Sequence, residues 1–424
     1  MTPALPDGDG FAYRNNRLHC EDVALDELAQ RFDTPLYVYS RRAIESAYDA
    51  YASALAGRPS MICYAVKANS NLAVLDVLTR RGAGFDIVSG GELARVLAAG
   101  GAANKVVFSG VGKSEAEIET ALKAGIAVFN VESAPELQRI DDVARRLSTR
   151  ARVSFRVNPD IDAGTHPYIS TGLKNNKFGV AYEEAPALCR AAVEMNAIEL
   201  VGLGCHIGSQ VTEVAPYIDA AARIIDLVDQ LAGENIRLRH IDLGGGLGIR
   251  YRDESPPRIA DLIAALLARL DARGHGDKTV IVEPGRSIVG NSGVLLTRVE
   301  YLKPGEAKNF AIVDAAMNDL IRPAMYDAWM NVVPVSPRAS NSTKYDIVGP
   351  VCESADWLAR DRSLAIEAGD LLAITGAGAY AMTMSSNYNS RPRPGEVMVD
   401  GSRAQQVRRR EAISDLFAAE SRLD

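Results

Sequence analysis

Residues 61–89 read MICYAVKANSNLAVLDVLTRRGAGFDIVS and contain one complete unit of the pattern that decides the fold. MICYAV (61–66) is an apolar run of the kind that favours β-strands, and GFDIVS (84–89) has the same character. Between them, NLAVLDVLTRRG (71–82) places apolar residues at helical spacing and ends at a glycine. The stretch therefore predicts a strand, a helix and a second strand.

The same alternation continues to about residue 283 and predicts eight strand–helix units in all. Helical patterns such as SEAEIETALKAG (114–125) separate the strand-like runs. Eight units over about 225 residues match a (β/α)₈ barrel, whereas a doubly wound sheet usually has fewer parallel strands and a reversal in their order. We predict an α/β protein built on a TIM-type barrel. The six further runs are KVVFS (105–109), IAVFNV (126–131), ARVSFRV (151–157), LVGLGCH (200–206), RLRHIDL (237–243) and TVIVE (279–283).

After about residue 290 the pattern changes to strands separated by turns, which predicts a second, mostly β domain of sandwich or barrel type. The first 35 residues contain a strand-like GFAYRNN and no barrel unit, so we expect them to pack with that domain. LYVYS (36–40) is then expected to cross into the barrel. The predicted division is an N-terminal segment over 1–35, the barrel over 36–285 and the β domain over 286–424. Its strands are expected at 294–302, 309–314, 344–351, 370–376 and 396–401.

Composition excludes several classes of protein. Of the 424 residues, 47% are hydrophobic and 24% charged, which is typical of a globular chain and not of a disordered or collagen-like one. The net charge of −7 gives no support to a nucleic-acid partner. Five widely spaced cysteines without a CxxC pair suggest neither a disulfide framework nor a zinc site, so no metal is expected. With no signal-like start and no apolar run of about 18 residues, we expect a cytoplasmic protein without a membrane partner.

Familiar nucleotide and hydrolase motifs are incomplete or missing. DLGGGLGI has Ile249 where a dinucleotide fingerprint needs its last glycine, and SGVGKSE has Val107 where a phosphate-binding loop needs its first. The sequence contains neither HExxH nor GxSxG. Zinc-peptidase and serine-hydrolase chemistry therefore lack local support.

Polar residues follow the predicted strands at their carboxyl ends, which carry the chemistry of a barrel. For Ser109 or Asn130 alone, a strand-end cap is an equally good explanation. Lys67 is different, because a lysine directly after an apolar strand is drawn to the barrel mouth, where desolvation favours nucleophilic use. The residues at these ends are Lys67, Asp86, Ser89, Ser109, Asn130, Asn158, His206, Gly244 to Gly246 and Glu283 to Arg286.

A nucleophilic lysine at a barrel mouth suggests pyridoxal 5′-phosphate, which also needs a phosphate cradle, a partner for its ring nitrogen and a surface for its ring. Glu283 can hold the ring nitrogen protonated. His206 can stack on the ring, although a structural core histidine is an equal alternative. The candidates for the cradle are the backbone of Gly244, Gly245 and Gly246, completed by Gly285 and Ser209.

An ordered set of motifs then resembles the diaminopimelate decarboxylase family, within the alanine racemase-like fold of pyridoxal phosphate enzymes. The resemblance covers about residues 35–400. YAVKAN and EPGR are shared with other decarboxylases of basic amino acids, whereas HPYISTGLKNNKFG (166–179) and CES (352–354) discriminate better. The full set is YAVKAN, FDIVSGGEL, HIGSQ, DLGGGLGI, EPGRSIV, MNDLIRPAMYDA, GPVCESADWLARDR and GAYAMTMSSNYNSRPRP.

The resemblance implies a role for each motif residue. Lys67 would bind the cofactor covalently, His206 would stack on its ring, and Gly246, the segment from Glu283 to Arg286 and Tyr380 would be further cofactor ligands. Cys352 would be the proton donor. The family also implies a homodimer with shared active sites, in which Cys352 and Glu353 reach the partner's barrel. Substrate would be bound by Arg286, Arg322, Tyr326, Glu353 and Tyr380.

The implied reaction is decarboxylation of meso-2,6-diaminopimelate to L-lysine and CO₂, the last step of lysine biosynthesis. An ornithine- or arginine-type decarboxylase is one alternative, but its substrate has only a cationic far end and gives no reason for Arg322 to accompany Glu353. A non-enzymatic cofactor-binding homologue is another, and it could dispense with Cys352 and Glu353. Two local departures from the family pattern are Ala355, where glycine is expected, and Trp329-Met330 in place of Tyr-His.

Overall fold

The computed structural model describes residues 5, 10–162 and 176–424. The chain forms two compact units, which we call the barrel unit (47–249 and 255–287) and the β unit (1–46, 250–254 and 288–424). Most of the discriminating stretch 166–179 lies outside the described residues.

Within the described part of the barrel unit, eight parallel strands close on themselves, and the predicted TIM-type barrel is confirmed. The order β5-β6-β7-β8-β9-β11-β12-β13 follows the sequence, and β13 pairs with β5 to complete the ring. A short strand, β10 (Val180–Ala181), adds to β9. The barrel strands are β5 (Ser60–Ala65), β6 (Gly84–Ile87), β7 (Val106–Phe108), β8 (Val128–Val131), β9 (Ala151–Asn158), β11 (Ile198–Gly204), β12 (His240–Asp242) and β13 (Thr279–Val282).

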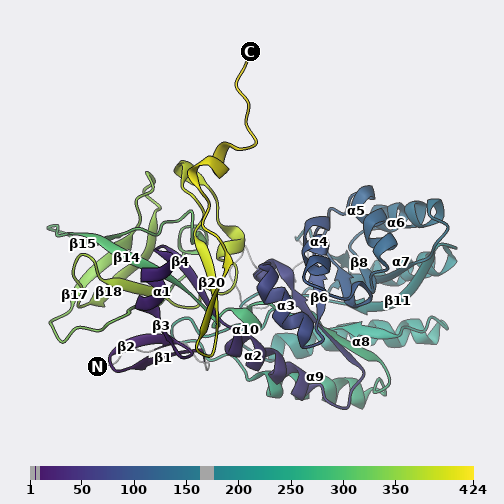
Figure 1. Cartoon of the computed structure of the whole chain (residues 1–424). Helices are drawn as coiled ribbons and strands as arrows, with labels where there is room; N and C mark the ends of the chain where they lie inside the picture. Colours follow the sequence, from purple (N-terminus) through teal and green to yellow (C-terminus); the bar gives the residue numbers. More distant parts are fainter. Residues whose placement is uncertain (1–4, 6–9, 163–175) are drawn as a thin grey trace. The chain divides into compact units, whose positions relative to one another are not determined.

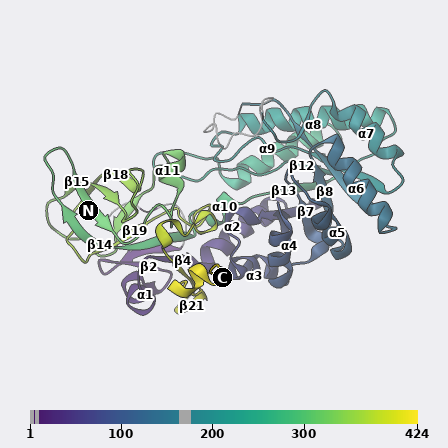
Figure 2. The same cartoon turned by 90° about the horizontal axis from the view of Figure 1, so that it is seen from above.

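Helices alternate with the strands and lie outside them, as Figure 1 shows for α4 to α7. α8 and α9 lie side by side in both views (Figure 1, Figure 2). α5 illustrates why the sequence folds this way: Ser114 and Glu117 form a capping box at its start, and Gly125 ends it in the left-handed region. The helices are α2 (Arg41–Ala54), α3 (Leu72–Arg80), α4 (Gly90–Ala98), α5 (Glu115–Ala124), α6 (Ala134–Arg146), α7 (Ala185–Glu194), α8 (Ala215–Gly233), α9 (Ile259–Ala272) and α10 (Arg286–Val289).

The β unit contains a large mixed sheet in the order β18-β17-β15-β14-β4-β20-β21, with β19 pairing with β14 and β16. The small sheet β1-β2-β3 and α1 belong to the same unit. Its elements are β1 (Phe11–Arg14), β2 (Arg17–Cys20), β3 (Val23–Ala24), α1 (Leu25–Phe32), β4 (Leu36–Ser40), β14 (Gly293–Lys303), β15 (Asn309–Val313), α11 (Arg322–Tyr326), β16 (Val332–Pro334), β17 (Thr343–Val348), β18 (Trp357–Leu364), β19 (Leu371–Ile374), β20 (Gly395–Asp400) and β21 (Arg403–Arg408).

β4 differs from its expected place. It is fully buried between antiparallel β14 and parallel β20, so residues 36–40 form an internal strand of the β unit and not a crossing into the barrel. Leu18 and Leu25 of the N-terminal segment share a core with Leu36. The chain therefore enters the barrel unit about ten residues later than expected, near residue 47.

Among the described residues, no helix is both long and apolar enough to span a membrane.

Candidate active site

Lys67 lies at the carboxyl end of β5, in the short 3₁₀ helix Val66–Ala68. Its Nζ is 2.5 Å from Oδ2 of Asp86, which stands on the neighbouring strand β6. The Asp86 side chain is 1% exposed, whereas that of Lys67 is 37% exposed. The pair thus anchors the lysine to a buried carboxylate while its amine remains accessible.

A second buried group joins three other strand ends. Nδ2 of Asn130, on β8, lies 3.2 Å from Oδ2 of Asp242 and 3.3 Å from Oε1 of Glu283. Burial raises the pKa of Asp242 to about 6, and burial together with the neighbouring carboxylates raises the pKa of Glu283 well above its usual range. The barrel mouth therefore contains a carboxyl group that is readily protonated.

The segment Gly244–Gly246 follows β12, and side chains at these positions would clash with the surrounding backbone or strain their own. Gly244 and Gly246 have φ values of 67° and 95°. A Cβ on Gly245 would lie 1.9 Å from the carbonyl oxygen of Glu283, so the backbone itself fills the space. This loop brings backbone N–H groups to the barrel mouth without side chains, as a phosphate cradle requires.

His206 follows β11 and is fixed by the glycine loop. Its Nδ1 accepts a hydrogen bond of 3.2 Å from the N–H of Gly245, which leaves the neutral ring with its proton on Nε2. Burial, with the positive charges of Arg156 and Lys67, lowers the pKa of His206 well below 6.5. A neutral imidazole of fixed orientation is suited to packing against a flat ring.

Arg286 begins α10 beyond β13 and is 3% exposed. Its Nη2 donates a hydrogen bond of 3.1 Å to Oγ of Ser209. Gly285, immediately before it, is also buried. The predicted cofactor residues of the barrel unit thus lie at the carboxyl ends of β5, β11, β12 and β13. The set fits pyridoxal phosphate: an amine, a protonatable carboxyl, a flat neutral ring, a glycine loop without side chains and a buried guanidinium.

The other predicted residues lie in the β unit. Arg322, the first residue of α11, is 6% exposed. Its guanidinium carbon lies 5.5 Å from the ring centroid of Tyr251 and 5.6 Å from that of Tyr326. Tyr380, with a φ of 53°, stands in the turn after β19. Two of the predicted substrate residues, Arg322 and Tyr326, are thus brought together by one helix.

Cys352 and Glu353 lie in the loop between β17 and β18, and both are exposed. The N–H of Cys352 donates to Oδ1 of Asn389 at 2.8 Å. Oδ2 of Asp356 accepts from the N–H of Val351 at 2.7 Å. The loop is therefore held by hydrogen bonds on both sides of the thiol, which remains accessible.

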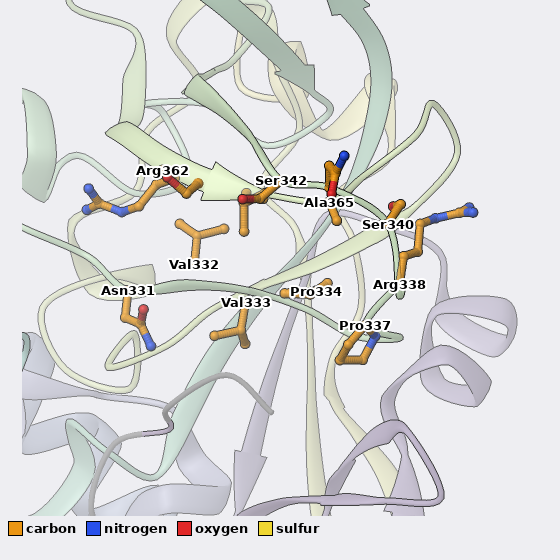
Figure 3. A pocket seen from close by; sticks show the side chains of 13 residues that line it. Asn331, Val332, Val333, Pro334, Pro337, Arg338, Ser340, Ser342, Arg362 and Ala365 are labelled. Carbon is orange, nitrogen blue, oxygen red and sulfur yellow. The ribbon is translucent and has the colours of Figure 1, made fainter. Parts of the chain in front are cut away.

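A hollow of about 600 Å³ in the β unit, lined by β16, β18 and residues 337–342, is a poorer candidate. Figure 3 shows the guanidinium groups of Arg362 and Arg338 at opposite ends of this hollow, each directed away from its centre. Arg338 is paired with Asp370 at 2.7 Å, and Arg362 donates to the carbonyl oxygen of Met330. Both guanidinium groups at this hollow therefore already bind other groups of the protein.

The sequence is similar to a known enzyme family over nearly its full length. Residues 41–290 match the model of the pyridoxal-dependent decarboxylase, pyridoxal binding domain. The chain is 60% identical to the diaminopimelate decarboxylase of Pseudomonas aeruginosa, over 98% of this chain and 99% of that one. The chain belongs to the diaminopimelate decarboxylase family.

Solved structures agree with this assignment. The diaminopimelate decarboxylase of M. jannaschii, which is 38% identical, superposes with a TM-score of 0.94 over 98% of both chains. That of Helicobacter pylori, solved with L-lysine, is 44% identical with a TM-score of 0.90, over 93% of this chain and 99% of that one. A lysine/ornithine decarboxylase of Vibrio vulnificus, at 23% identity, shares the fold.

Two residues of the site carried no predicted role. Asp242 is the last residue of β12 and lies two residues before Gly244, so its strand-end position, like that of Asp86, could have marked it from the sequence. Tyr251 could not have been found this way, because it packs beside Arg322 from 71 residues earlier in the chain and the contact has no local signal.

Proposed function

We propose that this member of the diaminopimelate decarboxylase family converts meso-2,6-diaminopimelate to L-lysine and CO₂ with pyridoxal 5′-phosphate as cofactor. The observation that carries the proposal is the barrel mouth, where the Lys67–Asp86 ion pair and the Asp242–Glu283 carboxyl pair end neighbouring strands beside the glycine loop. The identity to curated relatives supports the choice of substrate.

Each barrel residue then has a task at the cofactor. Lys67 would hold it covalently through its side-chain amine. His206 packs against the ring, and Glu283 keeps a proton at the ring nitrogen. Pyridoxal phosphate supplies an electron sink for the pair left on carbon when CO₂ departs. Gly244, Gly245 and Gly246 would line the phosphate, with Ser209, Gly285, Arg286 and Tyr380 around it. Because the N–H groups of Gly244 and Gly245 already donate to Asp242 and His206, the N–H of Gly246 is the one we assign to the anion.

The far end of the substrate is itself an amino acid, so it needs both signs of charge. Arg322 and Arg286 take its carboxylate, and Glu353 takes its ammonium, with Tyr326 and Tyr380 as further contacts. The aromatic rings of Tyr251 and Tyr326 beside Arg322 limit water around the guanidinium, which strengthens its attraction for a carboxylate.

Cys352 returns a proton to the carbon after CO₂ has left. We assign this thiol to the active site of a second copy of the chain, because it is exposed on a loop that its own backbone contacts hold in place. The active protein is then a homodimer with shared sites. The four other cysteines are buried free thiols, which fits a reducing compartment such as the cytoplasm.

The test is an assay of lysine and CO₂ formed from meso-diaminopimelate, with and without added pyridoxal phosphate. Lys67→Ala should abolish turnover and leave the fold intact. Lys123→Ala, which removes an exposed lysine paired with Glu119 on α5, is the matched control and should keep full activity. No lysine from cofactor-loaded wild type, or faster decarboxylation of ornithine or arginine, would overturn the proposal.

A further inference from the structure

Asp242 and Glu283 form a pair of acids that cannot both be charged without cost. The two residues are 2% and 8% exposed, and one amide nitrogen, that of Asn130, lies within 3.3 Å of an oxygen of each. Two buried carboxylates that share one amide donor would repel each other strongly. A proton on one of them removes this repulsion and allows the two carboxyl groups to hydrogen-bond to each other.

The surrounding donors decide which acid holds the proton. Oδ1 of Asp242 accepts from the N–H of Gly244 at 2.8 Å, and its Oδ2 accepts from Asn130. Both oxygens of Asp242 are therefore served by donors, which stabilise its charged form. The causes of the pKa shifts agree with this: burial raises both pKa values, but hydrogen bonds from Gly244 and Asn130 act to lower the pKa of Asp242, whereas the charge of Asp242 adds to burial in raising that of Glu283. Glu283 is thus the protonated member.

The other groups facing the pair do not supply a neutralising charge. The Lys67 ammonium is 2.5 Å from Asp86, so that carboxylate compensates its charge. The thiols of Cys63 and Cys205 are buried, and burial raises the pKa of each, which leaves both neutral. His206 is neutral as well. The proton shared within the pair is what balances the second carboxylate.

We propose that Asp242 and Glu283 hold one proton between them before the cofactor binds, and that Asn130 is the positioning residue that keeps the two carboxyl groups in register to share it. Its use rests on the proposed cofactor. When an unprotonated ring nitrogen arrives, the O–H bond of Glu283 breaks and an N–H bond forms on the ring. Glu283 is left as a carboxylate, and no proton is taken from solvent.

The test is infrared spectroscopy of the cofactor-free enzyme in H₂O and D₂O at about pH 8, where an ordinary carboxyl is ionised. Asp319 of the β unit, with a pKa raised to about 7 by burial, can also contribute a carboxylic-acid band. The band is therefore assigned from the difference between wild type and Glu283→Gln, with Asp319→Asn as the control that leaves it in place. We expect an acid C=O band from Glu283 that disappears when pyridoxal phosphate is added.

Asn130→Ala tests the positioning role. Loss of the amide donor should move deprotonation of Asp242 to higher pH and weaken pyridoxal phosphate binding about tenfold, the effect of one hydrogen bond to a charged group. An unchanged titration and affinity would remove Asn130 from this role.

The infrared bands of the cofactor-free enzyme test whether the pair holds a proton. Carboxylate bands alone from Glu283 in the cofactor-free enzyme would overturn the shared proton, whatever the enzyme's substrate. An acid band that persists in the cofactor-loaded enzyme would overturn the transfer. Failure of the proposed function appears separately, as absence of lysine formation.

Discussion

A Cβ on Gly246 would lie 2.0 Å from the carbonyl oxygen of Gly208, so the glycine loop and the loop after β11 are in direct backbone contact. The N–H of Val211 also donates to the carbonyl oxygen of Gly246 at 3.0 Å. The loops that carry His206 and the proposed phosphate cradle therefore keep their spacing only if residue 246 has no side chain.

Gly246→Ala should accordingly weaken pyridoxal phosphate binding by more than about tenfold, because the two loops must separate. Gly274→Ala is the matched control: its φ of 77° is similarly unfavourable for alanine, but nothing lies within 4 Å of the added Cβ. The control should lose about 1 kcal/mol of stability and keep its cofactor affinity. Equal affinities for both variants, measured by cofactor titration, would contradict the cradle.

Arg322→Ala should reduce kcat/KM for diaminopimelate by more than about tenfold. A buried carboxylate left without its cationic partner costs roughly 2 to 5 kcal/mol. The preference over ornithine, which has no distal carboxylate, should fall at the same time. Arg338→Ala removes a guanidinium paired with Asp370 on the surface and should leave these kinetics unchanged. Unchanged kinetics in the Arg322 variant would remove this residue from the substrate site.

Cys352→Ala should slow turnover while cofactor binding persists, since the thiol acts after CO₂ has left. Mixing inactive Lys67→Ala chains with slow Cys352→Ala chains should raise activity above that of either variant alone if subunits exchange, because some heterodimers then contain one intact site. The readout is lysine formation alongside mass-spectrometric proof of exchange. Complete exchange without recovered activity would count against a site built from two chains.

Two histidines should remain neutral at pH values where an ordinary histidine is charged. Burial lowers the pKa of His240 to about 4, and that of His206 is also depressed. A lowered folded-state pKa means that each neutral ring contributes stability above pH 6.5 that is lost as the pH falls, for His240 toward about 4. The pH dependence due to Asp242 runs the other way. Its pKa is raised to about 6, so its contribution to stability is present at low pH and is lost as the pH rises through that value.

The five histidines are few enough to follow individually by NMR of ¹³C-labelled imidazoles. The His240 signal, assigned with His240→Gln, should shift with a midpoint near 4, and His206 should show no transition near 6.5. A midpoint near 6.5 for either ring would contradict the buried, neutral assignment.

The barrel could be predicted because its strands are buried on both faces and read as continuous apolar runs, such as MICYA in β5. β18 gave no such signal, since WLARDRSL carries three charged residues, of which Arg360 and Asp361 are exposed and Arg362 is partly buried. LYVYS (36–40) was expected to lead into the barrel, because the sequence of a fully buried strand has the same apolar pattern in a barrel and in a mixed sheet. Its partners, β14 and β20, lie more than 250 residues away in the chain.

The candidate site divides in the same way. Lys67, His206 and Glu283 could be found from their positions after predicted strands, because the carboxyl ends of all barrel strands lie at the face that carries the active site. The contacts that give these residues their properties are non-local: Asn130 reaches Asp242 across 112 residues, and Gly245 fixes the tautomer of His206 across 39. Side-chain hydrogen bonds of this kind leave no periodic trace in the sequence.

The central claim is that Lys67 holds pyridoxal phosphate at the barrel mouth, and it is tested most directly by trapping that bond. The purified enzyme is loaded with pyridoxal phosphate, reduced with borohydride, digested and analysed by mass spectrometry. We predict a pyridoxyl group on the peptide that contains Lys67, and none in that peptide when residue 67 is alanine. A label found only on another lysine, or no label on an enzyme that forms lysine, would contradict the account.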